Sequence, residues 1–231
     1  MGPSFVAPPS SPRRRGAQPL TGKAARAVGQ EEARVEGQHT QVDLEKLQAA
    51  QRLMAEAMGE DCAEALEFTA DRFARWQKAA LVDPRTQYDP DNVKLYPVPD
   101  PACVELVTIK VTAFSACEHH YAPAWLKATI GYLPGQHYIG YSKMVKMFKH
   151  FACKYTMDER ICNDFLRELV SKVQPRGAGV LLRGKHFCVI SRGGNEHDFP
   201  MMSAFWGELK SNHSLRSEFY QHAMASWETG I

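Results

Sequence analysis

The stretch VTIKVTAFSACEHHYAPAWLKATIGYLPG, residues 107–135, decides the fold that we expect. Apolar and polar residues alternate over its first six positions and again over residues 126–132, which is typical of strands with one buried face. Between the two runs, Cys117, His119 and His120 place a thiol and two imidazoles within four positions. The stretch therefore predicts two strands joined by a turn that carries metal-binding or proton-transferring side chains.

The rest of the C-terminal part alternates between helical and β-like patterns. Two helical periods and two β-like runs follow in order, over residues 144–155, 161–173, 180–190 and 201–209. Ser214 opens a short last helix, and Gly184 interrupts a β-like run as a predicted bulge or bend. We therefore expect an α+β domain over residues 101–231, with an antiparallel four-stranded sheet, two helices on one face and the order β-β-α-α-β-β. The open edges of such a sheet predict oligomerisation through strand pairing.

Residues 41–100 predict a helical hairpin followed by an extended linker. The apolar residues of the first helix share one face, namely Leu44, Leu47, Met54 and Met58. Gly59 is its predicted end, and Asp61 is the predicted start of the second helix. Residues 83–101 contain five prolines and predict an extended connection.

Residues 1–40 predict a disordered basic tail. The first thirty residues contain five basic and no acidic side chains, together with many Pro, Ser, Gly and Ala residues. An organelle transit peptide has a similar composition, so targeting by this tail is the alternative. Weak contact with anionic partners is a further one.

Composition narrows the class of protein. A formal net charge of +2 argues against binding of polyanions by bulk charge, so we expect no specific nucleic-acid partner. No apolar run approaches the roughly 18 residues of a membrane span. The six cysteines lie in a mid-sized chain without an apolar signal segment, and some lie beside histidines. They predict reduced thiols in a cytoplasmic protein, with some of them binding a metal.

Two soft ligands close in sequence and a third from a distant strand predict an open zinc site. Cys117 and His120 reach one ion from the same turn, and Cys188 lies in a later β-like run that would form a neighbouring strand. Three protein ligands leave a fourth position for water, as in catalytic zinc sites. The alternatives are no metal or a closed structural site completed by Cys103 or Cys162.

Two histidines and a carboxylate lie close to these positions in the sequence. His119 and His186 each stand one or two residues from a predicted ligand and predict proton transfer near the metal, the alternative being structural histidines. Glu159 presents two acceptors that suit the N–H edge of a purine or pterin. Its alternative role is a capping box with Thr156.

A second cluster predicts phosphate binding. Ser142 is a predicted N-cap, and Lys143 and Lys146 stand in the first helical turn, where cations oppose the helix dipole. Free amides, a hydroxyl and two ammonium groups favour an anion at that end of the helix. A solvated basic face is the alternative.

Taken together, these residues resemble the GTP cyclohydrolase I family. The blocks that carry the resemblance are FSACEHHYAP (114–123), KATIGYLP (127–134), IGYSK (139–143), DER (158–160), GVLL (179–182) and KHFCVISRGG (185–194). The resemblance spans Thr69 to Phe219, and its three most specific parts are CEHH, IGYSK and H-x-C-x-x-x-R in this order.

The resemblance implies T-fold subunits in a ring-shaped homo-oligomer, a decamer of two stacked pentamers, with active sites between subunits. It implies that Cys117, His120 and Cys188 hold zinc (Zn2+), which activates the water that attacks C8 of the guanine ring of GTP. His119 would protonate a ring nitrogen, and His186 would move protons as formate leaves. The product would be 7,8-dihydroneopterin triphosphate.

The resemblance also implies substrate contacts, and the chain departs from the family pattern at several places, two of them at or beside these contacts. The implied contacts are Glu159 for the guanine edge and, for the phosphates, Ser142, Lys143, Arg192, Arg72 and Arg75. Lys146 stands where the family usually has Arg, which keeps the charge but loses the bidentate geometry. Asp158 replaces the usual Gln beside the guanine-binding Glu, so both positions predict an altered recognition of the substrate.

Three functions remain open from the sequence. The first is zinc-dependent opening of GTP, the start of folate, biopterin or modified-base routes. The second is a paralogue acting on another purine nucleotide, for which Asp158 is the motive. The third is a non-catalytic zinc-binding subunit of the same ring. The sequence identifies no regulatory partner.

Overall fold

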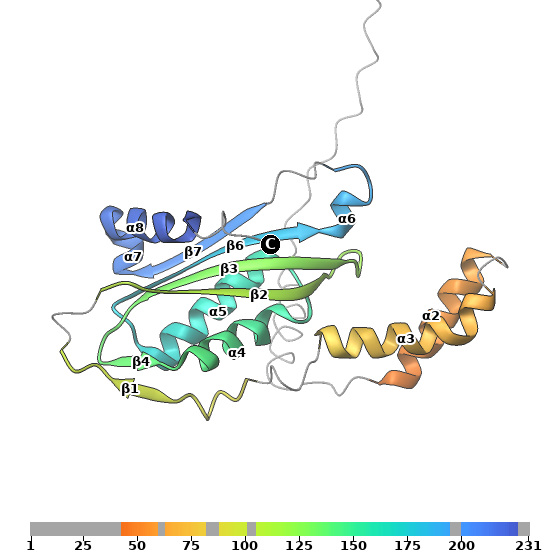
Figure 1. The fold of residues 1–231 in the computed structure, drawn as a ribbon, viewed down its shortest axis with the longest axis horizontal. Coiled ribbons are helices and arrows are strands. Elements are labelled where there is room, and N and C mark those ends of the chain that lie inside the picture. The colour runs from red at the N-terminus through yellow and green to blue at the C-terminus, as the bar shows by residue number, and fades with distance from the viewer. Residues whose placement is uncertain (1–42, 60–62, 82–87, 101–104, 195–199, 226–231) are drawn as a thin grey trace, which may run out of the picture. The chain divides into compact units, whose positions relative to one another are not determined.

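The computed structural model describes residues 43–59, 63–81, 88–100, 105–194 and 200–225 (Figure 1). Its elements in chain order are α2 Leu44–Met58, α3 Ala63–Leu81, β1 Leu95–Pro97, β2 Val107–Cys117, β3 Pro123–Leu133, β4 His137–Ile139, α4 Tyr141–Ala152, β5 Tyr155–Thr156, α5 Asp158–Val173, β6 Gly177–His186, α6 Phe187–Ile190, β7 Met201–Gly207, α7 Glu208–Ser211 and α8 His213–Met224. The predicted basic tail and Asp61 lie outside the described residues. Among those residues, no helix is both long and apolar enough to cross a membrane.

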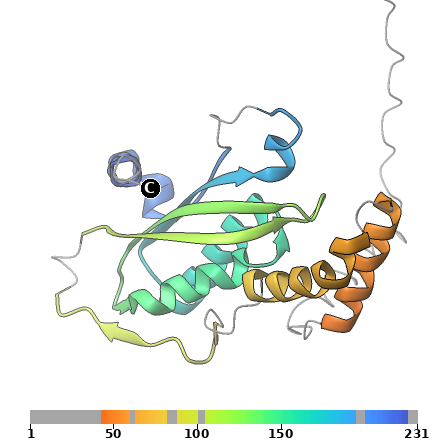
Figure 2. The same cartoon turned by 45° about the vertical axis from the view of Figure 1, so that its right-hand side comes forward.

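The main sheet has the strand order β5-β2-β3-β6-β7. The four long strands are antiparallel to their neighbours, and the two-residue β5 adds a parallel pair beside β2. Helices α4 and α5 cover one face, as Figures 1 and 2 show. The predicted α+β class and the order β-β-α-α-β-β of the T-fold are therefore confirmed. The sequence pattern did not predict β5 or the separate β1–β4 pair.

Alternation along the strands explains why the sheet has two packed faces. On β6, Val180 and Leu182 join the main core beneath α4 and α5, whereas Leu181 belongs to a second cluster with Phe219 of α8. These side chains are almost completely buried. Burial of each such residue stabilises the fold by about 1.5–3 kcal/mol, so the period of two fixes which face meets which helices.

The N-terminal helix α2 begins and ends where its sequence signals predict. The carboxylate of Asp43 accepts a hydrogen bond from the amide of Lys46 at 3.1 Å, and Gly59 ends the helix at φ 113°. None of its residues is buried, and Met54 and Met58 are largely exposed. Leu44 and Leu47 are half-buried, so the described residues cover its apolar face only in part.

Two predictions for the end of β6 were wrong. Phe187–Ile190 forms a short helix, α6, because β3 begins at Pro123 and offers no strand partner beyond His186. Instead the amide of Ser191 donates to the carbonyl of Phe187 at 2.9 Å. Gly184 forms no bulge and pairs in unbroken register with Leu126.

Two predicted helix caps were also wrong. The N-cap of α4 is Gly140, so Ser142 lies inside the first turn. The N-cap of α5 is Met157, because Thr156 belongs to β5, where it pairs with Cys117. The buried hydroxyl of Thr156 finds no hydrogen-bond partner among the described residues, so no capping box forms with Glu159.

Candidate active site

A compact turn connects β2 to β3 and carries the first two candidate ligands. The carbonyl of Cys117 accepts hydrogen bonds from the amides of His120 and Tyr121 at 3.3 and 2.8 Å, and its amide donates to Ala122 at 2.9 Å. Tyr121 takes a positive φ of 53°, which lets the chain reverse within a few residues. The turn therefore folds the imidazole of His120 back toward the thiol of Cys117.

The strand register brings the third candidate ligand to the same turn. His186 at the end of β6 pairs with Ala124 at the start of β3, so α6 begins beside the turn. Ligand atoms of Cys117, His120 and Cys188 all lie within 4.8 Å of one another. The two cysteines are buried and His120 is exposed, so the cluster is open on one side.

The donor set and its spacing fit a zinc ion. Zinc–sulfur and zinc–nitrogen distances of about 2.3 and 2.0 Å at a tetrahedral angle imply a separation of about 3.5 Å between ligand atoms. Cys117 Sγ and His120 Nδ1 lie 3.6 Å apart. Burial, followed by the neighbouring sulfur of Cys117, raises the pKa of the Cys188 thiol. A divalent cation between the sulfurs would offset the cost of burying a thiolate, because coordination deprotonates a thiol.

Two further histidines flank the cluster. The exposed His119 has its Nδ1 3.7 Å from Cys117 Sγ. His186 is half-buried, and its Nε2 lies 2.9 Å from Asp158 Oδ2. The hydrogen bond to Asp158 raises the pKa of His186, and burial opposes that shift. Both imidazoles therefore stand where a proton can be exchanged beside the cluster.

The two adjacent carboxylates at the start of α5 have different surroundings. Asp158 is only 7% exposed and its carboxylate contacts His186, whereas Glu159 is exposed. The sequence placed both in substrate recognition and gave no sign of the contact between Asp158 and His186. The two residues are 28 positions apart on different elements, so only the fold reveals the pair.

An ion pair holds the turn against α5 and was also missed. Arg160 donates to both carboxylate oxygens of Glu118, at 2.6 and 3.3 Å, and the amide of Glu118 donates to the carbonyl of Thr156. Both side chains are partly exposed, so the pair adds little stability and its main effect is on the geometry of the turn. In the sequence, the only sign of this ion pair was that Glu118 lies next to Cys117 and Arg160 lies next to Glu159.

The side chain of Arg192 contacts the backbone of Cys188, one of the three candidate ligands. Its Nε donates to the carbonyl of Cys188 at 2.7 Å, so the guanidinium folds back over α6. The residue is exposed, which leaves the positive charge at the surface beside the cluster. A guanidinium in this position suits an anionic group of a ligand.

The predicted phosphate-binding residues of α4 lie away from this cluster. Ser142, Lys143 and Lys146 stand in the first turns of α4, which follows β4. The other end of α4 leads into β5, which pairs with the end of β2 at Cys117. Twelve helical residues span about 18 Å, so one chain does not bring the two groups together.

Arg72 and Arg75 lie on a third element, α3. Both side chains are exposed, and Arg75 forms an ion pair with Asp71 one helical turn earlier. The described contacts do not join either arginine to the cysteine–histidine cluster. The structure therefore groups the predicted metal ligands, the two predicted catalytic histidines, Asp158 and Arg192, and leaves the other predicted basic residues on α3 and α4.

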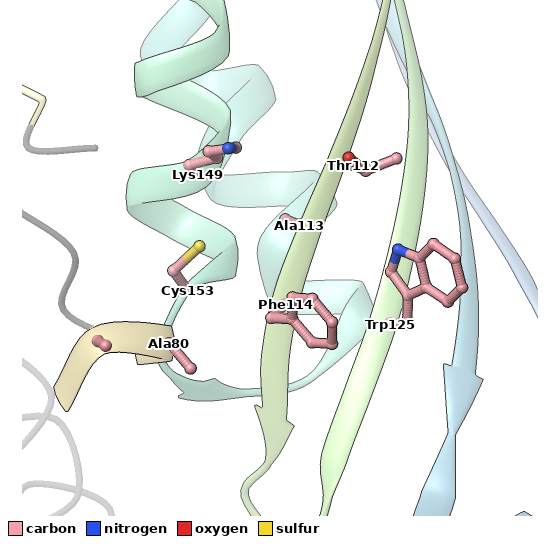
Figure 3. A pocket seen from close by; sticks show the side chains of 8 residues that line it. Ala80, Thr112, Ala113, Phe114, Trp125, Lys149 and Cys153 are labelled. Atoms are coloured by element: carbon pink, nitrogen blue, oxygen red, sulfur yellow. The ribbon is translucent and has the colours of Figure 1, made fainter. Parts of the chain in front are cut away.

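A surface hollow of about 280 Å³ lies beside β2 and does not contain this cluster. Figure 3 shows Phe114 and Trp125 on neighbouring strands, with Lys149 and Cys153 on the adjoining helix. The two aromatic rings stack with centroids 6.3 Å apart. None of the predicted site residues lines this hollow, so it does not account for the chemistry of the cluster.

Comparison with known proteins gives the family. The model of the family described as GTP cyclohydrolase I matches residues 47–224, which include every predicted site residue. The chain belongs to the GTP cyclohydrolase I family. The GTP cyclohydrolase 1 of Nitrosospira multiformis is 34% identical over 179 residues, which cover 73% of this chain and 89% of that protein. The GTP cyclohydrolase 1 of Aquifex aeolicus is 31% identical over 182 residues, covering 77% and 95% of the two chains.

Among solved structures, the apo form of the archaeosine synthase QueF-Like resembles part of the chain. The likeness covers 44% of this chain and 93% of that one, with a TM-score of 0.38 and 17% sequence identity. A likeness this distant supports no statement on activity. Membership of the GTP cyclohydrolase I family therefore depends on the sequence match, and the T-fold on the observed strand and helix order.

Proposed function

We propose that this chain is a zinc-dependent GTP cyclohydrolase I. It opens the guanine ring of GTP by hydrolysis, releases formate and yields 7,8-dihydroneopterin triphosphate, the first step of pterin biosynthesis. The observation that carries the proposal is the convergence of Cys117, His120 and Cys188 beside His119 and His186, in a chain of this family.

The cysteine–histidine cluster is the proposed zinc site. Cys117, His120 and Cys188 would hold the ion, and their three donor atoms leave one tetrahedral position open. Zinc bound there supplies Lewis acidity that makes water nucleophilic near neutral pH. Burial of both cysteines keeps bulk solvent from the sulfur side of the site.

The two flanking histidines carry the proposed proton transfers. His119 protonates the imidazole-ring nitrogen of guanine, and its position 3.7 Å from Cys117 places it at the edge of the cluster. His186 exchanges protons as the ring opens and formate leaves. The exposed carboxylate of Glu159 offers two acceptors to the N–H groups of the guanine edge. Each role needs a titratable or accepting group within reach of the reacting ring.

The phosphate-binding residues are proposed to serve the metal cluster of a neighbouring copy. Ser142 and Lys143 are about a helix length, and Lys146 about half of one, from the end of α4 that leads to the cluster of their own chain. A symmetric ring, proposed as a decamer, would place this end of α4 against the cluster of the next subunit. Arg192 beside the cluster, with Arg72 and Arg75 from α3, would complete the binding of the triphosphate.

The direct test is turnover of GTP beside a small panel of purine nucleotides. Formate release and, after oxidation, a fluorescent pterin are expected with GTP. Product from another purine nucleotide but none from GTP would favour a paralogue with a different substrate. Bound zinc without turnover of any purine would favour a non-catalytic ring subunit. Either of the last two results contradicts the proposed function.

A further inference from the structure

We infer that Asp158 is a positioning residue that orients His186, and that Gly184 is glycine to make room for the pair. The carboxylate of Asp158 lies 2.9 Å from His186 Nε2 and its residue is only 7% exposed. The inference rests on the proposed function, because that function gives His186 its role in proton transfer. It replaces the expectation that Asp158 reads the substrate.

Three elements build the pair. Asp158 is the first residue of α5, and His186 is the last residue of β6. Gly184 and His186 are two positions apart on the same strand, so they share one face of the sheet. The imidazole and the carboxylate therefore meet above the Cα atom of Gly184, on the face covered by α5.

Position 184 needs glycine, because any Cβ atom there would press on the Asp158–His186 pair. A Cβ atom added there would lie 2.8 Å from His186 Nε2, 2.9 Å from Asp158 Oδ2 and 3.0 Å from Leu126 Cδ2. Contacts of this length force neighbouring atoms apart, and Leu126 is completely buried and has no room to yield. The missing side chain is thus explained by close packing of the pair, not by a bulge.

The hydrogen bond selects one tautomer of His186. A carboxylate only accepts, so Nε2 carries the proton and donates it to Asp158. In the neutral ring, Nδ1 is then the nitrogen that remains free to exchange a proton. A buried carboxylate behind a histidine fixes both the tautomer and the ring orientation, as in other carboxylate–histidine pairs.

Asp158 is buried, whereas its neighbour Glu159 is exposed, so the two carboxylates differ in their access to a ligand. Glu159 is exposed and available to a ligand, whereas the oxygen of Asp158 is already engaged by the imidazole. A substrate contact at this position would mainly change KM. A positioning residue changes kcat instead, because it acts on the proton-transfer step through His186.

Kinetics of four variants test the inference. Asp158→Ala should lower kcat roughly 10- to 100-fold, part of what general acid–base catalysis contributes, with KM and zinc content little changed. Asp158→Asn should also lower kcat, because its NH2 group can donate to Nε2 and select the other tautomer although the shape of the side chain is kept. Gly184→Ala should reproduce the loss with both functional groups present. Asp164→Ala removes a partly exposed carboxylate from the same helix and should leave kcat unchanged.

A raised KM with wild-type kcat in Asp158→Ala would overturn the inference in favour of a substrate contact. So would a wild-type kcat in Asp158→Ala, since His186 would then need no carboxylate behind it. Wild-type kcat in a folded Gly184→Ala protein would remove the role assigned to Gly184.

A second measurement is independent of turnover. Nitrogen-15 NMR of the histidine-labelled, zinc-loaded protein reports the tautomer of His186, whose signal is identified by its loss in His186→Gln. At a pH where the ring is neutral, the Nε2–H form is expected in the wild type and a mixture in Asp158→Ala. An Nδ1–H form in the wild type would overturn the inference. Absence of GTP turnover would contradict the proposed function alone. The NMR spectrum would still show whether Asp158 orients His186.

Discussion

At the residue scale, the candidate site separates groups that hold a metal from groups that move protons. The three donor atoms within 4.8 Å are sulfurs and an imidazole nitrogen, whereas the imidazole of His186 contacts a carboxylate. Loss of a donor removes the ion and everything that depends on it. Loss of a proton-transferring imidazole leaves the ion in place.

Paired substitutions separate the two roles. Cys188→Ser should strip zinc and formate release together, because sulfur is lost from a three-donor site. His186→Ala should keep zinc and lose roughly 10²- to 10⁴-fold in kcat. Zinc content by elemental mass spectrometry and formate release by enzymatic assay measure both. Cys162→Ala, which removes a buried thiol outside the cluster, should keep both. Undiminished turnover in His186→Ala would remove its assigned role.

The sequence predicted some of these residues better than others. Cys117 and His120 were recognisable because their spacing and position after a strand already suggest one ion. Cys188 was a weaker candidate that depended on its place in a distant β-like run, since local spacing says nothing about a partner 71 residues earlier. The pairing of Asp158 with His186 was not predictable, because it depends on how the start of α5 meets the end of β6.

At the element scale, hydrophobic period and register decide what the sequence can predict. The long strands β2, β3, β6 and β7 and the helices α4 and α5 follow apolar patterns that repeat over many residues. Short elements do not: β5 has two residues and α6 has four. Their conformation depends on which neighbour is within reach, so tertiary contacts override local signals such as the Thr156–Glu159 spacing.

Tyr132 of β3 gives a pH prediction at this scale. Its buried hydroxyl accepts a hydrogen bond from the amide of Ile139 at 3.3 Å, and burial raises its pKa to about 12. The unfolded chain therefore loses this proton at lower pH than the folded one. The contribution of Tyr132 is fully present below about pH 10 and is lost as pH rises toward 12.

Urea unfolding between pH 9 and pH 11 measures this effect. The free energy of unfolding should fall over this interval in the wild type and fall less steeply in Tyr132→Phe, which has no proton to lose. Tyr88→Phe serves as a comparison, because burial and Glu168 raise the pKa of Tyr88 as well. Equal slopes in the wild type and Tyr132→Phe would show that Tyr132 does not titrate on unfolding.

At the scale of the whole molecule, one chain holds separated parts of the proposed site. The metal cluster lies at the end of β2, and Lys143 lies at the far end of α4. The apolar face of α2, which the described residues cover only in part, adds exposed surface. The ring that the sequence resemblance implies would solve both problems. No pattern within one chain specifies which subunit meets which, so the assembly stays a prediction.

Co-expression of two inactive chains tests whether sites are shared. His186→Ala damages the cysteine–histidine end of the proposed site and Lys143→Glu the first turn of α4, and each variant should lack turnover alone. Random assembly should restore up to roughly a quarter of wild-type activity, because that share of sites combines two intact halves. Separately purified variants, mixed without subunit exchange, are the control. A co-expressed mixture as inactive as either parent would show that each site belongs to a single chain.

The most direct test of the central claim is formate release from GTP by metal-stripped and zinc-restored protein. Cys117, His120 and Cys188 are proposed to hold the ion that drives ring opening. Removal of zinc by a chelator should therefore abolish formate release, and one zinc ion per chain should restore it in the wild type but not in Cys188→Ser. Formate release that continues undiminished in protein shown to be free of metal would contradict the account.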